Sequence, residues 1–418
     1  MTTIRPWRVT LQGAAALAAA MGVGRFVYTP ILPLMHAQAG LTVQLGSTLA
    51  TANYVGYLVG ALTGIAVPST VRSRSVLRAS LVVIIASLAL MPTTHSPAAW
   101  ITLRLLAGIA SALVFVVAVS AVLTTLRAHG QHLTGWAFGG VGAGIALSGA
   151  LVLALQASGT WRQAWWLAAA LTLVLAIPAW TLRTSDATSE NSASVSATPH
   201  SGSSKHFIAL FTAYTLEGIG YIIAGTFLVA AIDQSAPHWA GTGAWVLAGL
   251  AALPSSALWA WLSRIWSRPS LLAAALLIQA VGIALPALVG GIGPALVSAA
   301  AFGATFVGIS TLTLATGAHL GTPRAVAILT TGYSVGQIAG PLLVTPLLHN
   351  GYHEALLIAG AILLLAAATA GFARHRFPHH LGPLPTRVRN RDREASASGI
   401  ATRSTEIAES TENVGARS

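Results

Sequence analysis

The glycines of this chain recur at a fixed offset of 196 residues. The aligned pairs are Gly22 with Gly218, Gly24 with Gly220, Gly140 with Gly336, and Gly144 with Gly340. Arg72 aligns with Arg268 at the same offset, so the register holds in apolar segments and in the polar connections between them. Duplicated membrane bundles usually bind their solute near mid-bilayer, where the two copies meet. The offset therefore predicts two similar halves and favours a carrier.

The composition places the chain in a membrane. Hydrophobic residues make up 55% of it and charged residues only 8%, whereas soluble domains average roughly 25% charged residues. A helix needs about 20 apolar residues to cross the hydrocarbon. The predicted spans are residues 9–34, 44–66, 76–92, 98–124, 134–157, 160–182, 206–232, 238–262, 270–290, 294–318, 325–348 and 352–373. Cysteine is absent, which excludes disulfides, thiolate metal sites and a cysteine nucleophile.

The positions of the basic residues predict the orientation. Cytoplasmic loops of membrane proteins carry an excess of Lys and Arg. With the N-terminus inside, all of the 22 Lys and Arg residues except Arg25, Arg104 and Arg162 lie in the termini or at the cytoplasmic connections. We therefore expect a multi-pass protein of the cytoplasmic (inner) membrane with both termini cytoplasmic. The net charge of +12 then reflects topology and contact with anionic lipids rather than nucleic-acid binding.

Composition also divides the chain into parts. Residues 1–183 and 206–373 are expected to form an N-terminal and a C-terminal six-helix bundle. Residues 184–205 are rich in Ser, Thr and Ala with almost no large apolar residue, which predicts a cytoplasmic linker. Residues 374–418 are basic and then rich in Ser, Thr and Glu, which predicts a disordered cytoplasmic tail or, alternatively, a partner-binding segment.

The first span has an alternative interpretation as a secretory signal. Arg5 and Arg8 precede an alanine-rich run at 14–20, as in a cleavable signal peptide. The apolar character continues through Leu34, however, and the glycines of this span match those of the span 206–232. Both observations favour a transmembrane span that is not cleaved over a signal peptide.

Three sequence stretches resemble a known family. They are GRFVYTPILPLM at 24–35, YTLEGIGYI at 214–222 followed by TFL at 226–228, and YSVGQIAGP at 333–341. Over about residues 9–373 the chain resembles the YbfB/YjiJ-like branch of the major facilitator superfamily. The resemblance implies an all-α membrane protein with twelve transmembrane helices in two pseudo-symmetric six-helix bundles, the major facilitator fold, and alternating access to a central cavity. It implies little about the substrate.

The match to the wider superfamily is incomplete. The superfamily's loop after the second span carries a glycine and, four residues on, an aspartate; here Gly64 is followed by Pro68, and only the later Arg72 and Arg74 are kept. A cytoplasmic latch based on that aspartate is therefore in doubt. The spacing of Arg104, Gly108 and Ala112 is similar to a motif associated with proton coupling.

Two ionisable residues lie deep within predicted spans. A charge at the centre of a membrane helix costs about 2.5–3.5 kcal/mol on insertion scales, so Arg25 and Glu217 are expected to face a cavity or a partner. Arg25 aligns with Tyr221, which stands one helical turn from Glu217. We expect Arg25 to bind an anionic or polar substrate and Glu217 to carry a proton. Desolvation favours the neutral acid and a nearby cation favours the carboxylate, so separating the two side chains would favour protonation. The alternative is a permanent ion pair that locks the two spans together.

Other polar residues complete the predicted site. Arg104 either contributes to substrate binding or extends to the membrane interface. Tyr28, Asn53, Tyr221 and Gln337 could bind substrate, or equally bond a neighbouring helix. His349 and His353 are four residues apart, but Gly351 between them indicates a loop, so no metal site is expected. Pro30, Pro33, Pro341 and Pro346 remove backbone donors and predict bends in the first and eleventh spans.

These features predict a secondary active transporter. We expect a proton-coupled carrier of a small polar or anionic organic solute, acting as a monomer without a cofactor, in contact with proton, solute and membrane lipids. A nucleotide-binding loop is absent, which argues against an ATP-driven pump, and Glu217 has no nearby histidine in sequence, which argues against an enzyme. A broad-specificity efflux carrier for drugs or metabolites is the main alternative, and an acid-poor, aromatic-lined cavity would favour it. A transporter-like sensor without flux is a further alternative.

Overall fold

The computed structural model describes residues 6–126, 131–184, 203–320, 322, 324–374 and 377. All regular structure in these residues is helical, and 12 helical segments are long and apolar enough to cross a membrane. The α-helices are α1 (Pro6–Leu17), α2 (Tyr28–Ala39), α3 (Val43–Ala66), α4 (Arg74–Leu90), α5 (Pro97–Leu126), α6 (Gln131–Leu155), α7 (Trp161–Ala179), α8 (Ser203–Asp233), α9 (His238–Leu262), α10 (Arg268–Leu288), α11 (Ile292–His319), α12 (Ala325–Val344) and α13 (His353–Arg374). The predicted all-α membrane fold is confirmed, and each predicted span coincides with one segment. Most of the predicted linker and tail lies outside the described residues.

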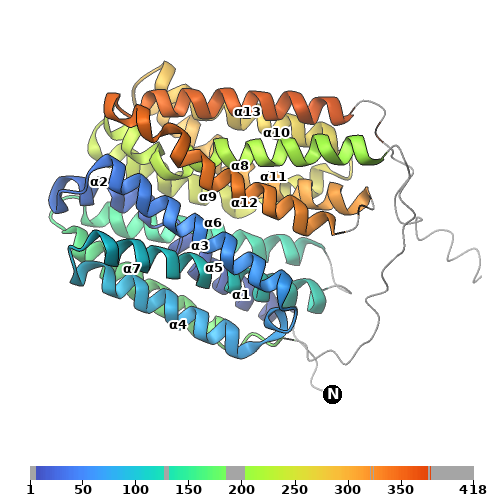
Figure 1. The fold of residues 1–418 in the computed structure, drawn as a ribbon, viewed down its shortest axis with the longest axis horizontal. Helices are drawn as coiled ribbons and strands as arrows, with labels where there is room; N and C mark the ends of the chain where they lie inside the picture. The colour runs from blue at the N-terminus through green and yellow to red at the C-terminus, as the bar shows by residue number, and fades with distance from the viewer. Residues whose placement is uncertain are drawn as a thin grey trace, which may run out of the picture. The chain divides into compact units, whose positions relative to one another are not determined.

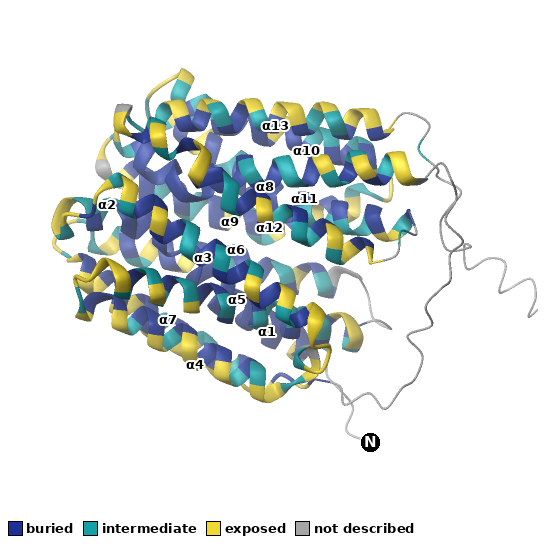
Figure 2. Ribbon diagram, in the orientation of Figure 1, coloured by how far each residue is buried: buried dark blue, intermediate teal, exposed yellow. Residues whose placement is uncertain are grey.

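The outward faces of the helices are apolar. Large hydrophobic side chains are widely exposed there, among them Ile177 at 66%, Leu288 at 68% and Phe372 at 79%. Figure 2 shows exposed residues on the outward faces and at the helix ends, with buried residues where the helices pack together. In water such a surface would aggregate, whereas hydrocarbon solvates it. The chain is therefore an integral multi-pass membrane protein.

The first six and the last six spans gather on opposite sides of the described bundle (Figure 1). The helix pairs that pack across the boundary include α6 with α9, α3 with α12, and α2 with α8. In the last pair, the Thr29 hydroxyl donates to the carbonyl of Gly225. These two residues are separated by the 196-residue offset, and equivalent residues of two related halves meet where a two-fold axis passes. The exact division at 183 and 206 stays a prediction.

The repeated glycines hold helices together within each half. A Cβ atom on Gly140 of α6 would lie closer than 3.0 Å to the carbonyl oxygen of Ala14 in α1, and one on Gly336 of α12 equally close to that of Thr215 in α8. The same two helices of each half thus approach backbone to backbone. Close approach of this kind supplies the dispersion contacts that drive helix association in lipid. The sequence offset therefore reflects one packing interface used twice.

Glycine also lines the contact between the halves. A Cβ on Gly139 of α6 would lie closer than 3.0 Å to the carbonyl oxygen of Leu253 in α9, and one on Gly249 of α9 equally close to the backbone nitrogen of Ala146. These contacts lie along the facing sides of α6 and α9, so the two helices approach backbone to backbone at this contact between the halves.

The first span is interrupted near its middle. A π-helical turn over Ala18–Val23 follows α1, and an irregular turn separates it from α2. Pro30 has no N–H to donate to the carbonyl of Phe26, and the N–H of Thr29 bonds there instead. The irregularity thus precedes the prolines, whereas bends were expected at Pro30 and Pro33. In the eleventh span, α12 includes Pro341 and continues after Val344 as a 3₁₀ helix over Thr345–Asn350.

We predict that Gly140→Ala lowers the melting temperature of the purified protein. The added methyl group gains at most about 1 kcal/mol of helix propensity, whereas overpacking typically costs about 1–3 kcal/mol, and the backbone of Ala14 cannot rotate away as a side chain would. Gly371→Ala in α13 is the matched control, because a methyl group added there would meet no atom within 4 Å. The control should be neutral or slightly stabilising. Equal melting temperatures for the two variants would contradict the packing interpretation.

Candidate functional site

Arg25 lies in the turn between the π-helical segment and α2, where the two halves meet. Its side chain is 3% exposed, and its Nη2 donates to Oε1 of Gln337 in α12. The guanidinium carbon lies 4.3 Å from the ring centre of Tyr57, 5.1 Å from that of Tyr54 and 5.3 Å from that of Phe26. Aromatic faces stabilise a cation through their quadrupole. The charge of Arg25 is therefore surrounded by an amide and three rings instead of a carboxylate.

Glu217 is the second buried charge. It lies on α8 and is 0% exposed, and neither carboxylate oxygen has a hydrogen-bond partner. Arg25 and Glu217 thus share no hydrogen bond in this conformation, and the bond of Arg25 goes to Gln337. An ionised carboxylate buried without partners is very costly, and the neutral acid much less so. The surroundings of Glu217 therefore suit a group that binds and releases a proton.

Five nearly parallel aromatic rings include the two tyrosines that flank Glu217 on α8, and we call the five rings the ring stack. Its members are Tyr214 and Tyr221 of α8, Phe302 and Phe306 of α11, and Tyr333 of α12. The ring centres of Tyr214 and Tyr333 are 4.4 Å apart, those of Tyr221 and Tyr333 are 5.4 Å apart, and the planes differ by 14° and 12°. Tyr214 and Tyr221 stand three residues before and four after Glu217, so the three side chains share one face of α8.

Sequence reasoning identified part of the ring stack. Tyr221 is among the residues that the sequence predicts to bind substrate. Sequence reasoning missed Phe302 and Phe306, whose spacing of four residues places them on one face of α11. That spacing was the available signal, but it is equally common in helix packing.

Arg104 is buried rather than extended to the membrane interface, so the interface alternative is wrong. Its side chain is 2% exposed, and its Nη1 and Nη2 donate to the carbonyl oxygens of Gly24 at 3.3 Å and of Arg25 at 3.2 Å. The guanidinium also lies 4.9 Å from the ring centre of Tyr28. The irregular turn in the first span leaves these carbonyls in need of donors, and a planar guanidinium serves two acceptors at once. Arg104 therefore holds the backbone that carries Arg25.

Asn53 and Tyr28 make structural contacts within the first half. Asn53 Nδ2 donates to the carbonyl oxygen of Arg104 at 3.0 Å, and the Tyr28 hydroxyl donates to that of Gly46 at 2.7 Å. In this conformation both side chains position Arg104 and its neighbours. Their binding of substrate stays a prediction.

Polar contacts join the halves between the central site and the end of the bundle where α2 and α8 finish, which we call the outer end. Ser47 Oγ lies 2.5 Å from Thr345 Oγ1, and the Tyr54 hydroxyl lies 2.7 Å from Thr226 Oγ1. The Tyr352 hydroxyl lies 3.1 Å from Nε2 of His36. Burial raises the pKa of Tyr352 to about 12, so its hydroxyl stays protonated and can donate to the imidazole at physiological pH.

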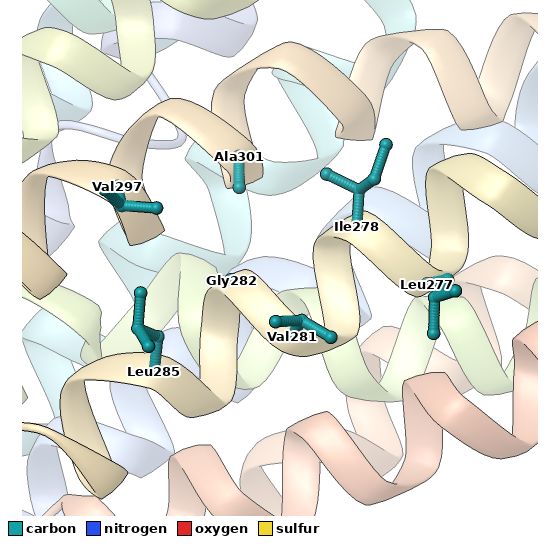
Figure 3. A pocket seen from close by; sticks show the side chains of 7 residues that line it. All are labelled: Leu277, Ile278, Val281, Gly282, Leu285, Val297 and Ala301. Atoms are coloured by element: carbon teal, nitrogen blue, oxygen red, sulfur yellow. The ribbon is translucent and has the colours of Figure 1, made fainter.

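A groove on the outer surface is distinct from this site. It lies between α10 and α11, has a volume of about 310 Å³, and is lined by Leu277, Ile278, Val281, Gly282, Leu285, Val297 and Ala301 (Figure 3). Its lining has no polar side chain, and Val281 and Val297 are more than half exposed. A polar solute would find no hydrogen-bonding side chain there, so the groove is a hydrocarbon-facing surface feature.

Comparison with known proteins supports the fold and the family. The model of a family described as "uncharacterised MFS-type transporter YbfB" matches residues 17–370. Among solved structures, the chain is similar to that of a point mutant of the nucleoside transporter NupG, with a TM-score of 0.64 and 13% sequence identity over 88% of this chain and 100% of that chain. At that identity the likeness shows the fold alone. A search of curated proteins found no match.

We predict that Arg104→Lys lowers the melting temperature through loss of the two backbone contacts. An ammonium group cannot reproduce the guanidinium fork, and a buried carbonyl left without its donor costs about 1–3 kcal/mol. Arg162→Lys is the control, because Arg162 is exposed and its guanidinium contacts the rings of His95 and Trp161 at the surface. That variant should melt close to the native protein. If the melting temperature of Arg104→Lys also equals that of the native protein, Arg104 does not have the positioning role.

Proposed function

Because the chain belongs to the family of transporters described as uncharacterised MFS-type transporter YbfB, we propose that it is a proton-coupled secondary transporter. It moves a small polar or anionic organic solute across the cytoplasmic membrane by alternating access. In this proposal the chain acts as a monomer with both termini in the cytoplasm. The observation that carries the proposal is the pair of buried, mutually unbonded charges, Arg25 and Glu217, beside the contact of the two halves.

Arg25 supports an anionic or polar solute. Desolvating a guanidinium is costly unless an opposite charge or good hydrogen bonds compensate, and here one amide bond and three rings do so only in part. The Nε of Arg25 and the Nε2 of Gln337 are buried donors without partners. A carboxylate or another strong acceptor on a solute would satisfy both donors. The solute is thus the counter-ion that Arg25 lacks.

Glu217 supports proton coupling. In the water-free surroundings of this conformation the neutral acid has a lower free energy than the carboxylate. When the halves rearrange and water or a cation reaches the side chain, the carboxylate becomes favourable and the proton leaves. An anionic solute on Arg25 and a proton on Glu217 would then cross together without net charge. This pairing would let the proton gradient drive transport of the solute across the membrane.

The outer end supports alternating access. Opening it would break the contacts Ser47–Thr345, Tyr54–Thr226 and His36–Tyr352, each worth about 0.5–1.5 kcal/mol net. The sum is a few kcal/mol, a range in which a bound solute can shift the balance of two states. In this proposal the halves move against each other along the glycine-lined contact of α6 and α9.

One observation favours the second candidate, a broad-specificity efflux carrier for drugs or metabolites. The ring stack offers apolar, flat surfaces that a drug could contact, and Glu217 beside it could be the acidic partner that a cationic drug needs. Arg25, however, would repel the positive charge of such a drug. Flux of an organic anion, but not of a cationic dye, would separate the primary proposal from this candidate.

We predict that Glu217→Gln abolishes solute-driven proton movement in proteoliposomes while solute binding is retained. The amide keeps the size of the side chain but cannot take up and release a proton at physiological pH. Proton movement is measured with an internal pH-sensitive dye after addition of a mixed panel of small organic acids. Glu354→Gln is the control, because Glu354 is exposed at the start of α13. If Glu217→Gln liposomes acidify as the native ones do, Glu217 is not the proton carrier.

We predict that a disulfide between Ser47→Cys and Thr345→Cys arrests transport reversibly. The two hydroxyl oxygens lie 2.5 Å apart, so cysteines at these positions are close enough to bond, and the native chain has no cysteine to interfere. Oxidation should stop flux and reduction should restore it, because the outer end cannot open while the bond persists. Each single-cysteine variant is the control. Undiminished flux in the oxidised double variant would show that the outer end need not open.

A further inference from the structure

The first half of the chain is cationic and contains no acid. Residues 1–185 include ten arginines and neither Asp nor Glu. In the described part of the chain the acids are Glu217, Asp233 and Glu354, and all three belong to the second half. Glu217 is buried at the centre, and the other two lie at the outer end. No described carboxylate of the first half can therefore neutralise the arginines at its surface.

Four of these arginines gather at the end of the first half where α1 and α4 begin and α7 finishes. Helix α7 packs against both α1 and α4, and the three lie together in Figure 1. Gln12 of α1 donates to the hydroxyl of Thr181 at 2.7 Å, and Arg78 Nε of α4 donates to the carbonyl oxygen of Trp180 at 3.2 Å. The group that these contacts bring to one end consists of Arg8, Arg74, Arg78, Arg183 and Trp180, and we call it the arginine patch.

The guanidinium groups of the arginine patch have donors to spare. Arg8, Arg74 and Arg183 are exposed. The guanidinium carbon of Arg78 lies 5.2 Å from the ring centre of Trp180, and its bond to the backbone uses Nε alone. Both contacts fix the orientation of Arg78 and leave its two Nη groups as a fork, a geometry that suits phosphate. Within the described residues, no carboxylate contacts any of the four guanidinium groups.

The arginine patch borders the hydrocarbon-facing surface. Trp180 is 38% exposed, and tryptophan is enriched where membrane and water meet. Deeper along the same two helices the exposed side chains are apolar, among them Val82 of α4 and Val174 and Ile177 of α7 (Figure 2). A ligand with an anionic head and long apolar tails would match both parts of this surface.

From this arrangement we infer that the arginine patch is a binding site for an anionic phospholipid. Its phosphate accepts hydrogen bonds from the Nη groups of Arg78 and the neighbouring guanidinium groups, and its acyl chains lie along α4 and α7. Basic pockets between membrane helices bind anionic head groups in this way. The sequence predicts contact with anionic lipids only in general, and the inference assigns it to one place. It goes beyond the proposed function and does not depend on the solute or on the proton.

The internal repeat supplies a comparison for the arginine patch. At the offset of 196 residues, Arg74 and Arg78 of α4 align with Ser270 and Ala274 of α10. The second half has the equivalent helix start without this pair of charges. The pair is therefore a property of the first half and does not follow from the repeated frame.

The test measures lipid binding by native mass spectrometry of the purified full chain in detergent micelles. The probes are anionic dioctanoyl phosphatidylglycerol, zwitterionic dioctanoyl phosphatidylcholine, and soluble glycerol 3-phosphate. Since each arginine near the membrane surface contributes roughly a fivefold gain in affinity for anionic lipid, we expect phosphatidylglycerol to bind at least about fivefold tighter than phosphatidylcholine. Equal affinity of the two lipids would overturn the anionic requirement. Glycerol 3-phosphate binding as tightly as phosphatidylglycerol would assign the patch to soluble phosphates and overturn the lipid site.

Substitutions assign the preference to the arginine patch. Arg74→Gln combined with Arg78→Gln should weaken phosphatidylglycerol binding by about 25-fold, and lysine at both positions should restore most of it because the charges remain. Arg264→Gln combined with Arg374→Gln is the matched control, because it removes two exposed charges from the second half and should keep the native affinity. Equal losses in the patch and control variants would assign binding to net charge and overturn the site. Arg74→Gln alone, at an exposed side chain, should cost about fivefold and tests the site even if the double variant fails to fold.

Discussion

The contact of the Arg104 guanidinium with the carbonyls of Gly24 and Arg25 is the interaction on which the central site depends. Lipid offers no hydrogen-bond donor, so a membrane helix can depart from regular bonding only where protein groups replace the missing partners. Arg104 is that replacement, and Asn53 in turn donates to its backbone. With the irregular turn held in this way, the side chain of Arg25 reaches across to Gln337 on α12. A straight, fully bonded first span would leave Arg104 without these acceptors.

The two charges at the centre oppose stability. Arg25 has rings and one amide in place of a carboxylate, and both oxygens of Glu217 lack partners. A bundle selected for stability alone would hold apolar residues there, since replacing buried charges with well-packed hydrophobic residues is often neutral or stabilising. Ionisable groups within membrane spans are costly and mark pathways of substrates and ions. The cost is understandable if the missing partners arrive during the working cycle, as solute at Arg25 and as water or a cation at Glu217.

Sequence alone predicted the parts of this structure that depend on local pattern. The twelve spans follow from apolar length. The glycine offset predicts two similar halves, and the contacts Gly140–Ala14 and Gly336–Thr215 are an interface that the two halves share. The burial of Arg25 and Glu217 follows from the cost of charge in hydrocarbon. The role of Arg104 did not follow, because its acceptors are exposed only by an irregular turn eighty residues earlier. The ring stack did not follow either, since it needs three helices in register, and spacing within each helix does not specify which faces meet.

The symmetry of the two halves explains how a cation and an aromatic surface come to face each other. Thr29 and Gly225 are equivalent residues and are in contact, so the two-fold axis passes between them. One turn earlier in each half stand the equivalent residues Arg25 and Tyr221. The repeat makes these two positions equivalent, and they carry a guanidinium in one half and a phenol ring in the other. The frame repeated in the two halves thus carries different chemistry on its two sides, a cation on one and an aromatic ring on the other.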